Sequence, residues 1–169
     1  MRLILVRHAE AADHDPSLRQ DDGLRPLTPE GRRVHTRMAA DLARVEPGAR
    51  RILTSPLLRA RETAEITAHA IGMSTGSIRV LEALGDGFSK KELLEEIRRL
   101  PSEAVVILVG HAPTLGQLAA GFLHRGGEIA IEFEKSSMLC LDFEGYPAAG
   151  AATLCWFLTP KGLPRSPAP

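Results

Sequence analysis

The sequence predicts an α/β fold in which helices cover both faces of a mostly parallel central sheet, a three-layer α/β/α arrangement. Two apolar runs, residues 3–6 and 104–109, have the composition of strands that are buried on both faces. Segments with helical periodicity alternate with these runs and with shorter candidate strands, which is typical of parallel sheets. The 169 residues are enough for one domain with a sizeable core, which we expect to span residues 1–159. The proline-rich segment 160–169 is expected to be a disordered tail.

The composition excludes several classes of protein. The 21 Lys and Arg residues balance the 21 Asp and Glu residues, which argues against binding nucleic acid by broad phosphate neutralisation. No apolar run approaches 18 residues, so we expect neither a transmembrane segment nor a membrane partner. The chain opens directly on a candidate strand and lacks a signal-peptide layout, so the cytoplasm is the expected location.

The two cysteines, Cys140 and Cys155, both lie in apolar runs near the C-terminus. The sequence has no C-x-x-C motif and no Cys/His cluster, so it does not predict a structural zinc site. A hairpin of the two runs could place the thiols across from each other, but the favoured expectation is that both cysteines are buried free thiols in a reducing compartment.

The first half of the chain contains a long polar loop and two helices. Residues 9–27 are expected to form a solvated loop, because the adjacent Asp13, His14 and Asp15 rarely supply a whole metal coordination shell. Thr28 is the expected N-cap of a helix whose apolar stripe is Val34, Met38, Leu42 and Val45. After a strand at 51–54, Ser55 is the expected N-cap of a second helix that runs through Ile71. Its expected buried face consists of Leu57, Ala60, Ala64, either Thr67 or Ala68, and Ile71.

The second half continues the alternation. A short strand is expected at 78–81, and Ser89 is the expected cap of a helix that ends at Leu100. The apolar strand 104–109 leads into a helix from Pro113 toward Leu123. Residues 138–143 and 153–158 are expected to form a hairpin at one side of the sheet.

Cationic side chains follow the predicted strands at three places. Arg7 and His8 end the first strand, Arg59 lies one turn into the second helix, and His111 follows the strand 104–109. Because right-handed crossovers bring the carboxyl ends of parallel strands to one edge, we expect these groups to converge. Two arginines, two histidines and two helix N-termini suit a compact dianion such as phosphate. The alternative for Arg59 is a solvated helix charge, which is what we expect of Arg61.

Several common phosphate and hydrolase motifs are missing. The sequence has no G-x-x-x-x-G-K-[ST], no G-x-G-x-x-G and no G-x-S-x-G. A P-loop, a dinucleotide fold and a serine hydrolase elbow therefore lack support. The reaction that fits the remaining residues is phosphoryl transfer with a histidine nucleophile.

Three segments carry a resemblance to the histidine phosphatase (phosphoglycerate mutase-like) superfamily: Leu5-Val6-Arg7-His8-Ala9, Ser55-Pro56-Leu57-Leu58-Arg59-Ala60 and Gly110-His111. They occur in the family's order and at matching spacings, and the resemblance covers roughly residues 1–160. The short length, the Arg25-Pro26-Leu27-Thr28 segment and the Ser-Pro-x-x-Arg-Ala form bring the chain closest to the SixA-like phosphohistidine phosphatases.

The resemblance implies a role for each of these residues. His8 would attack phosphorus and become a phosphohistidine, while Arg7, Arg59 and His111 would bind the equatorial oxygens. Arg25 would assist in SixA-like members. Such a site needs no metal and no cofactor, since its side chains supply the positive charge. Neighbouring cations would lower the pKa of His8 and keep its attacking nitrogen unprotonated.

The sequence departs from the family pattern at two positions. Ala9 replaces the usual glycine after the nucleophile, which an alanine can do only if φ at that residue is not positive. Many members have a glutamate that protonates the leaving oxygen, and Glu82 is the candidate here, although its match is loose. An imidazole leaving group, whose pKa is near 6.5, needs such an acid far less than an alkoxide does.

The expected function is therefore a cytoplasmic hydrolase that removes phosphate from protein phosphohistidine. Phosphatases of small phosphate esters, or of phosphoserine and phosphothreonine proteins, stay open as alternatives, and so does a non-catalytic module that binds phosphorylated ligands. A mutase fits less well because the chain has little spare length for a lid. Among the other histidines, His35 and His69 are expected on helix surfaces and His124 at a helix end.

Overall fold

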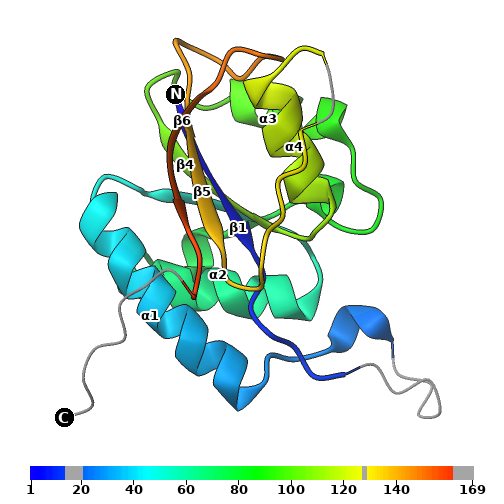
Figure 1. Cartoon of the computed structure of the whole chain (residues 1–169). Coiled ribbons are helices and arrows are strands. Elements are labelled where there is room, and N and C mark those ends of the chain that lie inside the picture. The colour runs from blue at the N-terminus through cyan, green and yellow to red at the C-terminus, as the bar shows by residue number, and fades with distance from the viewer. Residues whose placement is uncertain (14–20, 127–128, 162–169) are drawn as a thin grey trace.

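The computed structural model describes residues 1–13, 21–126 and 129–161. Six strands form one sheet in the order β3-β2-β4-β1-β5-β6 (Figure 1). Neighbours among β3, β2, β4 and β1 pair in parallel, whereas β5 and β6 are antiparallel. The predicted mostly parallel α/β class is therefore confirmed. The strands are β1 (Arg2–Arg7), β2 (Arg51–Thr54), β3 (Arg79–Val80), β4 (Val105–Gly110), β5 (Met138–Asp142) and β6 (Thr153–Leu158).

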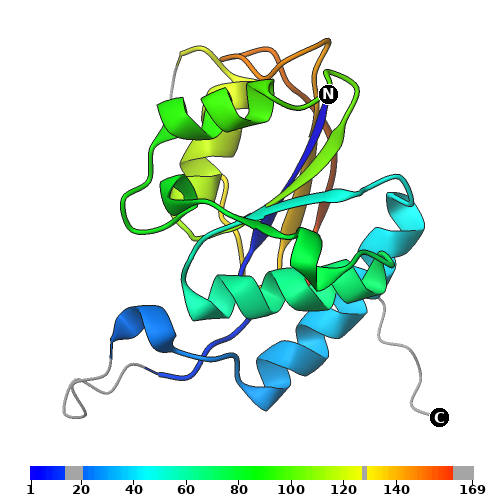
Figure 2. The same cartoon turned by 180° about the vertical axis from the view of Figure 1, so that it is seen from behind.

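Helices form a layer on each face of the sheet (Figures 1 and 2). One layer contains α1 (Pro29–Val45) and α2 (Leu58–Ala70), and the other contains α3 (Lys90–Arg98) and α4 (Thr114–Leu123). In the described part of the chain, three short 3-10 helices lie in the connections: η2 (Asp22–Leu24), η3 (Thr75–Ser77) and η4 (Glu82–Leu84). Within the described ranges, no helix combines the length and apolar character needed to cross a membrane.

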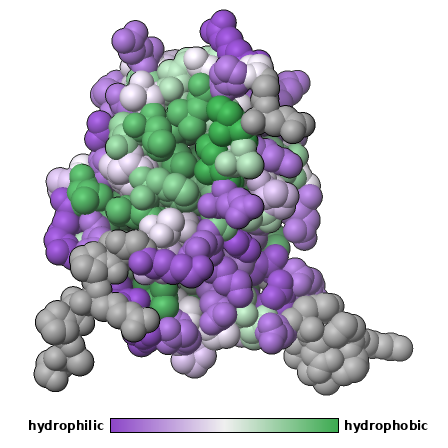
Figure 3. Space-filling model, in the orientation of Figure 1, coloured by the Kyte–Doolittle hydropathy of each residue, from purple (hydrophilic) through white to green (hydrophobic). Residues whose placement is uncertain are grey.

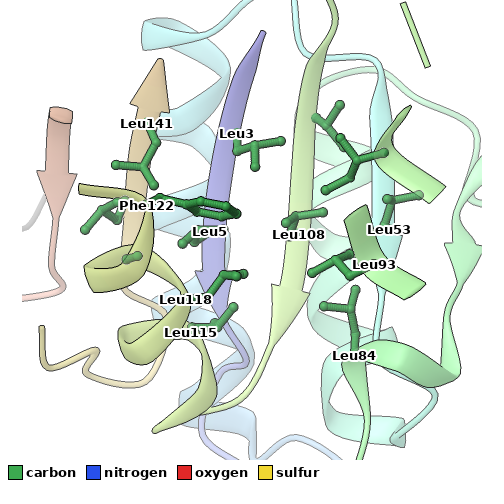
Figure 4. Close-up of a cluster of buried hydrophobic side chains, with 14 of the residues drawn as sticks. Leu3, Leu5, Leu53, Leu84, Leu93, Leu108, Leu115, Leu118, Phe122 and Leu141 are labelled. Carbon is green, nitrogen blue, oxygen red and sulfur yellow. The ribbon is translucent and has the colours of Figure 1, made fainter. Parts of the chain in front are cut away.

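The alternation of side chains along β1 builds two cores. Leu3 and Leu5 pack with side chains of α3 and α4, while Ile4 and Val6 pack with side chains of α1 and α2. Figure 4 shows Leu3 and Leu5 together with Phe122 of α4 and Leu108 of β4. Burying a side chain of this size stabilises the fold by about 1.5–3 kcal/mol. Helices thus cover both faces of β1 and β4, and these two strands lie in the centre of the sheet.

Two of the three predicted N-caps are present. The Thr28 hydroxyl accepts a hydrogen bond from the Gly31 amide at 2.9 Å, and the Ser89 hydroxyl accepts one from Glu92 at 3.3 Å. The prediction for Ser55 is wrong, since Leu57 occupies the N-cap position of α2. The Ser55 amide extends the β2–β4 pairing by donating to Val109, and the Ser55 hydroxyl accepts from the Leu57 amide at 3.3 Å just before α2 begins.

The surface of α1 differs from the predictions in two respects. The prediction that His35 lies on a helix surface is wrong, because its spacing from Gly31, Met38 and Leu42 places it on the buried inner face of α1. The apolar stripe ends at Leu42, since Val45 is 49% exposed. The other two histidines, His69 and His124, are not buried, in agreement with the predictions.

Cys140 is buried in β5, but Cys155 is exposed, so the prediction for the second thiol is wrong. The reason is that Cys155 lies on β6, the last strand of the sheet, whose side chains are mostly exposed. Leu154 and Phe157 of the same strand are 47% and 38% exposed. Figure 3 shows apolar side chains gathered in the upper part of the face that carries β6.

Parts of the predicted solvated loop 9–27 are structured. Ala11 forms an isolated bridge with Leu27, and η2 lies between them in the chain. Asp13 is exposed, whereas His14 and Asp15 lie outside the described residues. Most of the predicted C-terminal tail, residues 162–169, also lies outside them.

Candidate active site

Two histidines meet at the carboxyl edge of the sheet. Arg7 of β1 is the register partner of Gly110 of β4, so the residues that follow, His8 and His111, leave neighbouring strands at the same edge. Their ring centroids lie 5.1 Å apart with the planes tilted by 54°. The His8 amide also donates to the Gly110 carbonyl at 3.0 Å, which ties the two strand ends together.

The His8 ring is held in one tautomer. Its Nδ1 atom lies 2.7 Å from the Ala9 carbonyl oxygen, which can only accept a hydrogen bond. Nδ1 therefore carries the proton, and in the neutral ring Nε2 keeps a free lone pair. Burial lowers the pKa of His8 to about 3, with smaller contributions from His111, Arg59 and Arg7 and an opposing one from the Ala9 hydrogen bond. Desolvation thus has a larger effect than the neighbouring cations that the sequence suggests.

Ala9 fits where the family usually has glycine. Among the non-glycine residues described by the structure, only Ser136 has a positive φ, at 67°. The Ala9 backbone is therefore one that an L-residue can adopt. Its side chain is buried against Ala11 and Leu27.

Arg59 is buried rather than solvated. Its exposed fraction is 7%, whereas Arg61, two positions further along α2, is exposed. The Arg59 Nη1 atom donates to the Asp22 carbonyl oxygen at 2.9 Å and lies 3.1 Å from the Asp22 carboxylate. The alternative that Arg59 is a surface charge is therefore wrong.

Arg7 and His111 complete the cluster. The Nη1 atom of Arg7 donates to the Phe133 carbonyl oxygen at 2.6 Å, and burial lowers the pKa of Arg7. The Nε2 atom of His111 lies 2.7 Å from the Ser55 hydroxyl oxygen. Burial, aided by Arg59, lowers the pKa of His111 to about 4, with Asp86 opposing it.

Three nitrogen atoms of these side chains are buried without a hydrogen-bond partner among the described residues: Arg7 Nε, Arg59 Nε and His111 Nδ1. Buried polar atoms are rarely left unpaired, because each lost hydrogen bond costs about 1–3 kcal/mol. Unpaired nitrogens on two guanidinium groups and an imidazole suit an anionic ligand with several acceptor oxygens.

The two remaining candidates from the sequence lie differently. Arg25 is half-buried and donates from Nε to the Asp22 carboxylate at 2.7 Å, so it joins the cluster through Asp22. Glu82, at the start of η4, is exposed, and its carboxylate has no hydrogen bond or ion pair to any of the described residues. Arg25 is therefore linked to the cluster by a hydrogen bond, whereas the carboxylate of Glu82 is not hydrogen-bonded or ion-paired to the cluster among the described residues.

Sequence reasoning missed three residues of the site. Asp22 binds Arg59 and Arg25, and its spacing of three residues from Arg25 was the available signal. Ser55, predicted as a helix cap, accepts from the Leu57 amide at 3.3 Å and also contacts His111. Thr63 binds the Ala9 amide at 3.0 Å, a contact across 54 residues that no local pattern indicates.

No group of three or more His, Cys, Asp or Glu side chains is placed to hold a metal ion within residues 1–13, 21–126 and 129–161. The guanidinium groups of the cluster come from β1 and α2, and its imidazoles follow β1 and β4 in the chain.

Comparison with known proteins agrees with this geometry. The model of the histidine phosphatase superfamily (branch 1) matches residues 3–86, the part that contains His8 and Arg59. An uncharacterised protein of Picosynechococcus sp. (strain ATCC 27264 / PCC 7002 / PR-6) is 39% identical over 120 residues, which are 70% of this chain and 71% of that protein. The chain belongs to the histidine phosphatase superfamily.

Within this superfamily the chain is similar to SixA proteins along nearly its whole length. Phosphohistidine phosphatase SixA of Escherichia coli (strain K12) is 28% identical over 165 residues, 96% of each chain. The solved structure of the protein histidine phosphatase SixA complexed with tungstate has a TM-score of 0.80 and 27% identity. That match covers 95% of this chain and 98% of the other. The histidine phosphatase fold predicted from the sequence is thus confirmed.

Proposed function

We propose that this histidine phosphatase hydrolyses phosphohistidine in a protein, with His8 as the nucleophile. The observation that carries the proposal is the His8 ring, whose Nδ1 donates to Ala9 while His111 lies 5.1 Å away. A histidine held this way offers its Nε2 lone pair to an electrophile without first losing a proton. Its low pKa, about 3, keeps that lone pair free at neutral pH.

The unpaired nitrogens supply the phosphoryl site. Arg7 and Arg59 would each donate from Nε to a phosphoryl oxygen, since both atoms are buried and unpaired within the described residues. The Ser55 hydroxyl would donate to His111 Nε2, which leaves Nδ1–H of His111 as a third donor. Donors placed before the reaction stabilise the charge that develops on the transferred group. Arg25, fixed by Asp22, would bind the outer side of the substrate.

In the first step, His8 Nε2 forms a bond to phosphorus while the bond between phosphorus and the substrate imidazole breaks. A substrate ring that is protonated on its other nitrogen leaves as neutral imidazole, so no proton has to move in this step. His8 becomes an imidazolium that carries phosphate on Nε2 and hydrogen on Nδ1. The Ala9 carbonyl oxygen, 2.7 Å from Nδ1, stabilises that positive charge.

In the second step, water attacks phosphorus and the bond from phosphorus to Nε2 breaks. His8 returns to the neutral ring with Nδ1–H, and the phosphoryl group leaves as dihydrogen phosphate, which then ionises. Both protons of the water depart with this product, so the balance closes without a metal or cofactor.

The position of Glu82 supports phosphohistidine over a phosphate ester. An alkoxide leaving group needs a proton from an acid, whereas imidazole, with a pKa near 6.5, leaves unaided. Glu82, the candidate acid, is exposed, and its carboxylate has no hydrogen bond or ion pair with any of the described site residues. The similarity to SixA of E. coli, named a phosphohistidine phosphatase, supports the same substrate class.

The proposed partner is a phosphorylated protein and the proposed compartment is the cytoplasm. The buried free thiol of Cys140 supports a reducing environment. The balanced formal charge supports a protein substrate rather than nucleic acid.

The experiment compares a phosphohistidine peptide with phosphoserine peptide and a chromogenic phosphate ester. Rapid quenching into base and mass spectrometry should detect phosphate on His8 during turnover of the phosphohistidine peptide. His8→Ala should abolish turnover, while His69→Ala, which changes an exposed histidine, should have no effect. Glu82→Gln should leave phosphohistidine turnover unchanged. Activity of His8→Ala within about threefold of wild type would overturn the mechanism, and faster turnover of either ester would overturn the substrate class.

A further inference from the structure

A single hydroxyl links the nucleophile turn to the helix that carries Arg59. The Thr63 Oγ1 atom accepts a hydrogen bond from the Ala9 amide at 3.0 Å and donates one to the Arg59 carbonyl oxygen at 2.6 Å. Thr63 is buried, so water cannot replace either bond. Both hydrogen-bonding functions of this hydroxyl are therefore used between the two halves of the site.

The Ala9 peptide is where the tautomer of His8 is set. The Ala9 carbonyl accepts from His8 Nδ1, and the amide of the same residue is bound to Thr63. The amide belongs to the His8–Ala9 peptide unit and the carbonyl to the next one, so once Thr63 fixes the first plane only the φ and ψ angles of Ala9 can move the carbonyl. The carbonyl then stays in line with Nδ1, and Nε2 stays directed away from the backbone.

The carbonyls of His8 and Glu10 are held by other backbone groups, whereas the Ala9 amide is bound by a side chain. The His8 carbonyl accepts from the Ser136 amide at 3.2 Å, and the Glu10 carbonyl accepts from Thr28 at 2.9 Å. The Ala9 amide is the other end of the same peptide unit as the His8 carbonyl, and its partner is the Thr63 side chain.

We infer that Thr63 is a positioning residue for catalysis, which holds the Ala9 peptide so that His8 keeps its Nδ1–H tautomer and presents Nε2 to phosphorus. The inference rests on the proposed function, since it assumes that His8 is the nucleophile. Thr63 itself contacts neither the substrate nor the reacting atoms.

The next turn of α2 provides a matched control. Thr67 is also buried, and its hydroxyl donates to the carbonyl four residues earlier, that of Thr63, at 2.9 Å. The same hydroxyl lies 2.9 Å from Nε2 of His35 on α1. It is not the partner of the Ala9 amide, which is bound to Thr63. Replacing Thr67 by valine thus removes a buried hydroxyl of the same kind without freeing the Ala9 amide.

The experiment measures Thr63→Val, Thr63→Ser and Thr67→Val in the full chain on the phosphohistidine peptide. Thr63→Val should lower kcat by about ten- to a hundredfold with little change in KM, since a small displacement of the nucleophile affects the reaction more than binding. Thr63→Ser keeps the hydroxyl and should restore kcat. Thr67→Val should stay within about threefold of wild type. Nitrogen-15 NMR of the His8 ring should show one tautomer in wild type and Thr67→Val, and a mixture in Thr63→Val.

Equal kcat values and a single His8 tautomer in Thr63→Val and Thr67→Val would overturn the inference. That result would leave the proposed function intact, whereas an active His8→Ala variant would overturn the function first. If Thr63→Val fails to fold, Thr63→Ala provides the same test without the added methyl group. A Thr63→Ala protein with wild-type kcat and one His8 tautomer would likewise overturn the inference.

Discussion

The guanidinium group of Arg59 lies against Asp22, with Nη1 2.9 Å from the Asp22 carbonyl oxygen and 3.1 Å from its carboxylate. The other carboxylate oxygen of Asp22 accepts from Arg25 Nε at 2.7 Å. One acidic side chain thus organises two cations of the proposed phosphoryl site and also neutralises part of their charge. Its negative charge lies beside the guanidinium group whose unpaired Nε is proposed to bind a phosphoryl oxygen.

Asp22→Asn should therefore strengthen the binding of inorganic phosphate. The amide keeps one oxygen, which can accept from Arg25 Nε, and it leaves the hydrogen bond from Arg59 to the Asp22 carbonyl oxygen in place. It removes the negative charge. We expect a gain of about 1 kcal/mol, roughly a fivefold lower inhibition constant, because the Asp22 carboxylate is half exposed and screened by water. Inhibition of turnover by inorganic phosphate measures this inhibition constant. Glu103→Gln, the same charge change before the amino end of β4, should have no effect, and weaker phosphate binding by Asp22→Asn would contradict the prediction.

Arg59→Ala should reduce kcat/KM by far more than Arg61→Ala. Arg59 is buried beside Asp22 with an unpaired Nε, whereas Arg61 is exposed on the same helix. Loss of one donor to a developing oxyanion costs about 2–4 kcal/mol of transition-state stabilisation. Steady-state kinetics on the phosphohistidine peptide provide the measurement. Equal kcat/KM for the two variants would remove Arg59 from the phosphoryl site.

The sequence predicted the fold and the meeting of His8 with His111 because those features follow from local pattern and general topology. Apolar runs such as residues 3–6 identify buried strands, and the handedness of crossovers brings their carboxyl ends together. Thr28 was recognisable as a helix cap because its partner lies three residues away. Ser55 has the same local pattern and accepts from the Leu57 amide at 3.3 Å, but its hydroxyl also contacts His111, 56 residues away, which no local pattern indicates.

Contacts between distant segments could not be predicted in this way. The partner of Arg59 is Asp22, 37 residues earlier, and the partner of Ala9 is Thr63. The burial of His35 depends on which face of α1 packs against α2, and an imidazole does not mark that face as an apolar side chain would. The exposure of Cys155 depends on β6 being the edge strand, which the sequence of β6 alone does not reveal.

Gly31→Ala should disturb the nucleophile turn. A Cβ atom at Gly31 would lie 2.2 Å from the Glu10 carbonyl oxygen, and that backbone atom is held by Thr28. One of the two segments must move, so we expect a loss of about 1–3 kcal/mol in the free energy of unfolding together with reduced kcat. Gly48→Ala is the control, because a Cβ atom at Gly48 would have nothing within 4 Å. Urea unfolding and turnover measure both effects, and a Gly31→Ala protein that matches Gly48→Ala in both would show that the turn tolerates the displacement.

His35 should make the stability of the protein depend on pH. Burial lowers the pKa of His35 to about 4, below the value near 6.5 that it has in the unfolded chain. As the pH falls from about 6.5 to 4, the unfolded chain takes up a proton that folded His35 does not, so the free energy of unfolding decreases by up to about 1.4 kcal/mol per pH unit. His8 and His111, whose pKa values are also lowered by burial, act in the same direction. Well above pH 6.5 none of the three contributes a slope.

His35→Gln should flatten this dependence. The glutamine amide can donate to the Thr67 hydroxyl, as His35 Nε2 does at 2.9 Å, but it does not titrate. Urea unfolding at pH 7 and pH 5 should show a smaller difference for His35→Gln than for wild type. His69→Gln, which changes an exposed histidine on α2, should keep the wild-type difference. An unchanged difference in His35→Gln would mean that His35 gains its proton at the same pH in the folded and unfolded protein, contrary to its burial between α1 and α2.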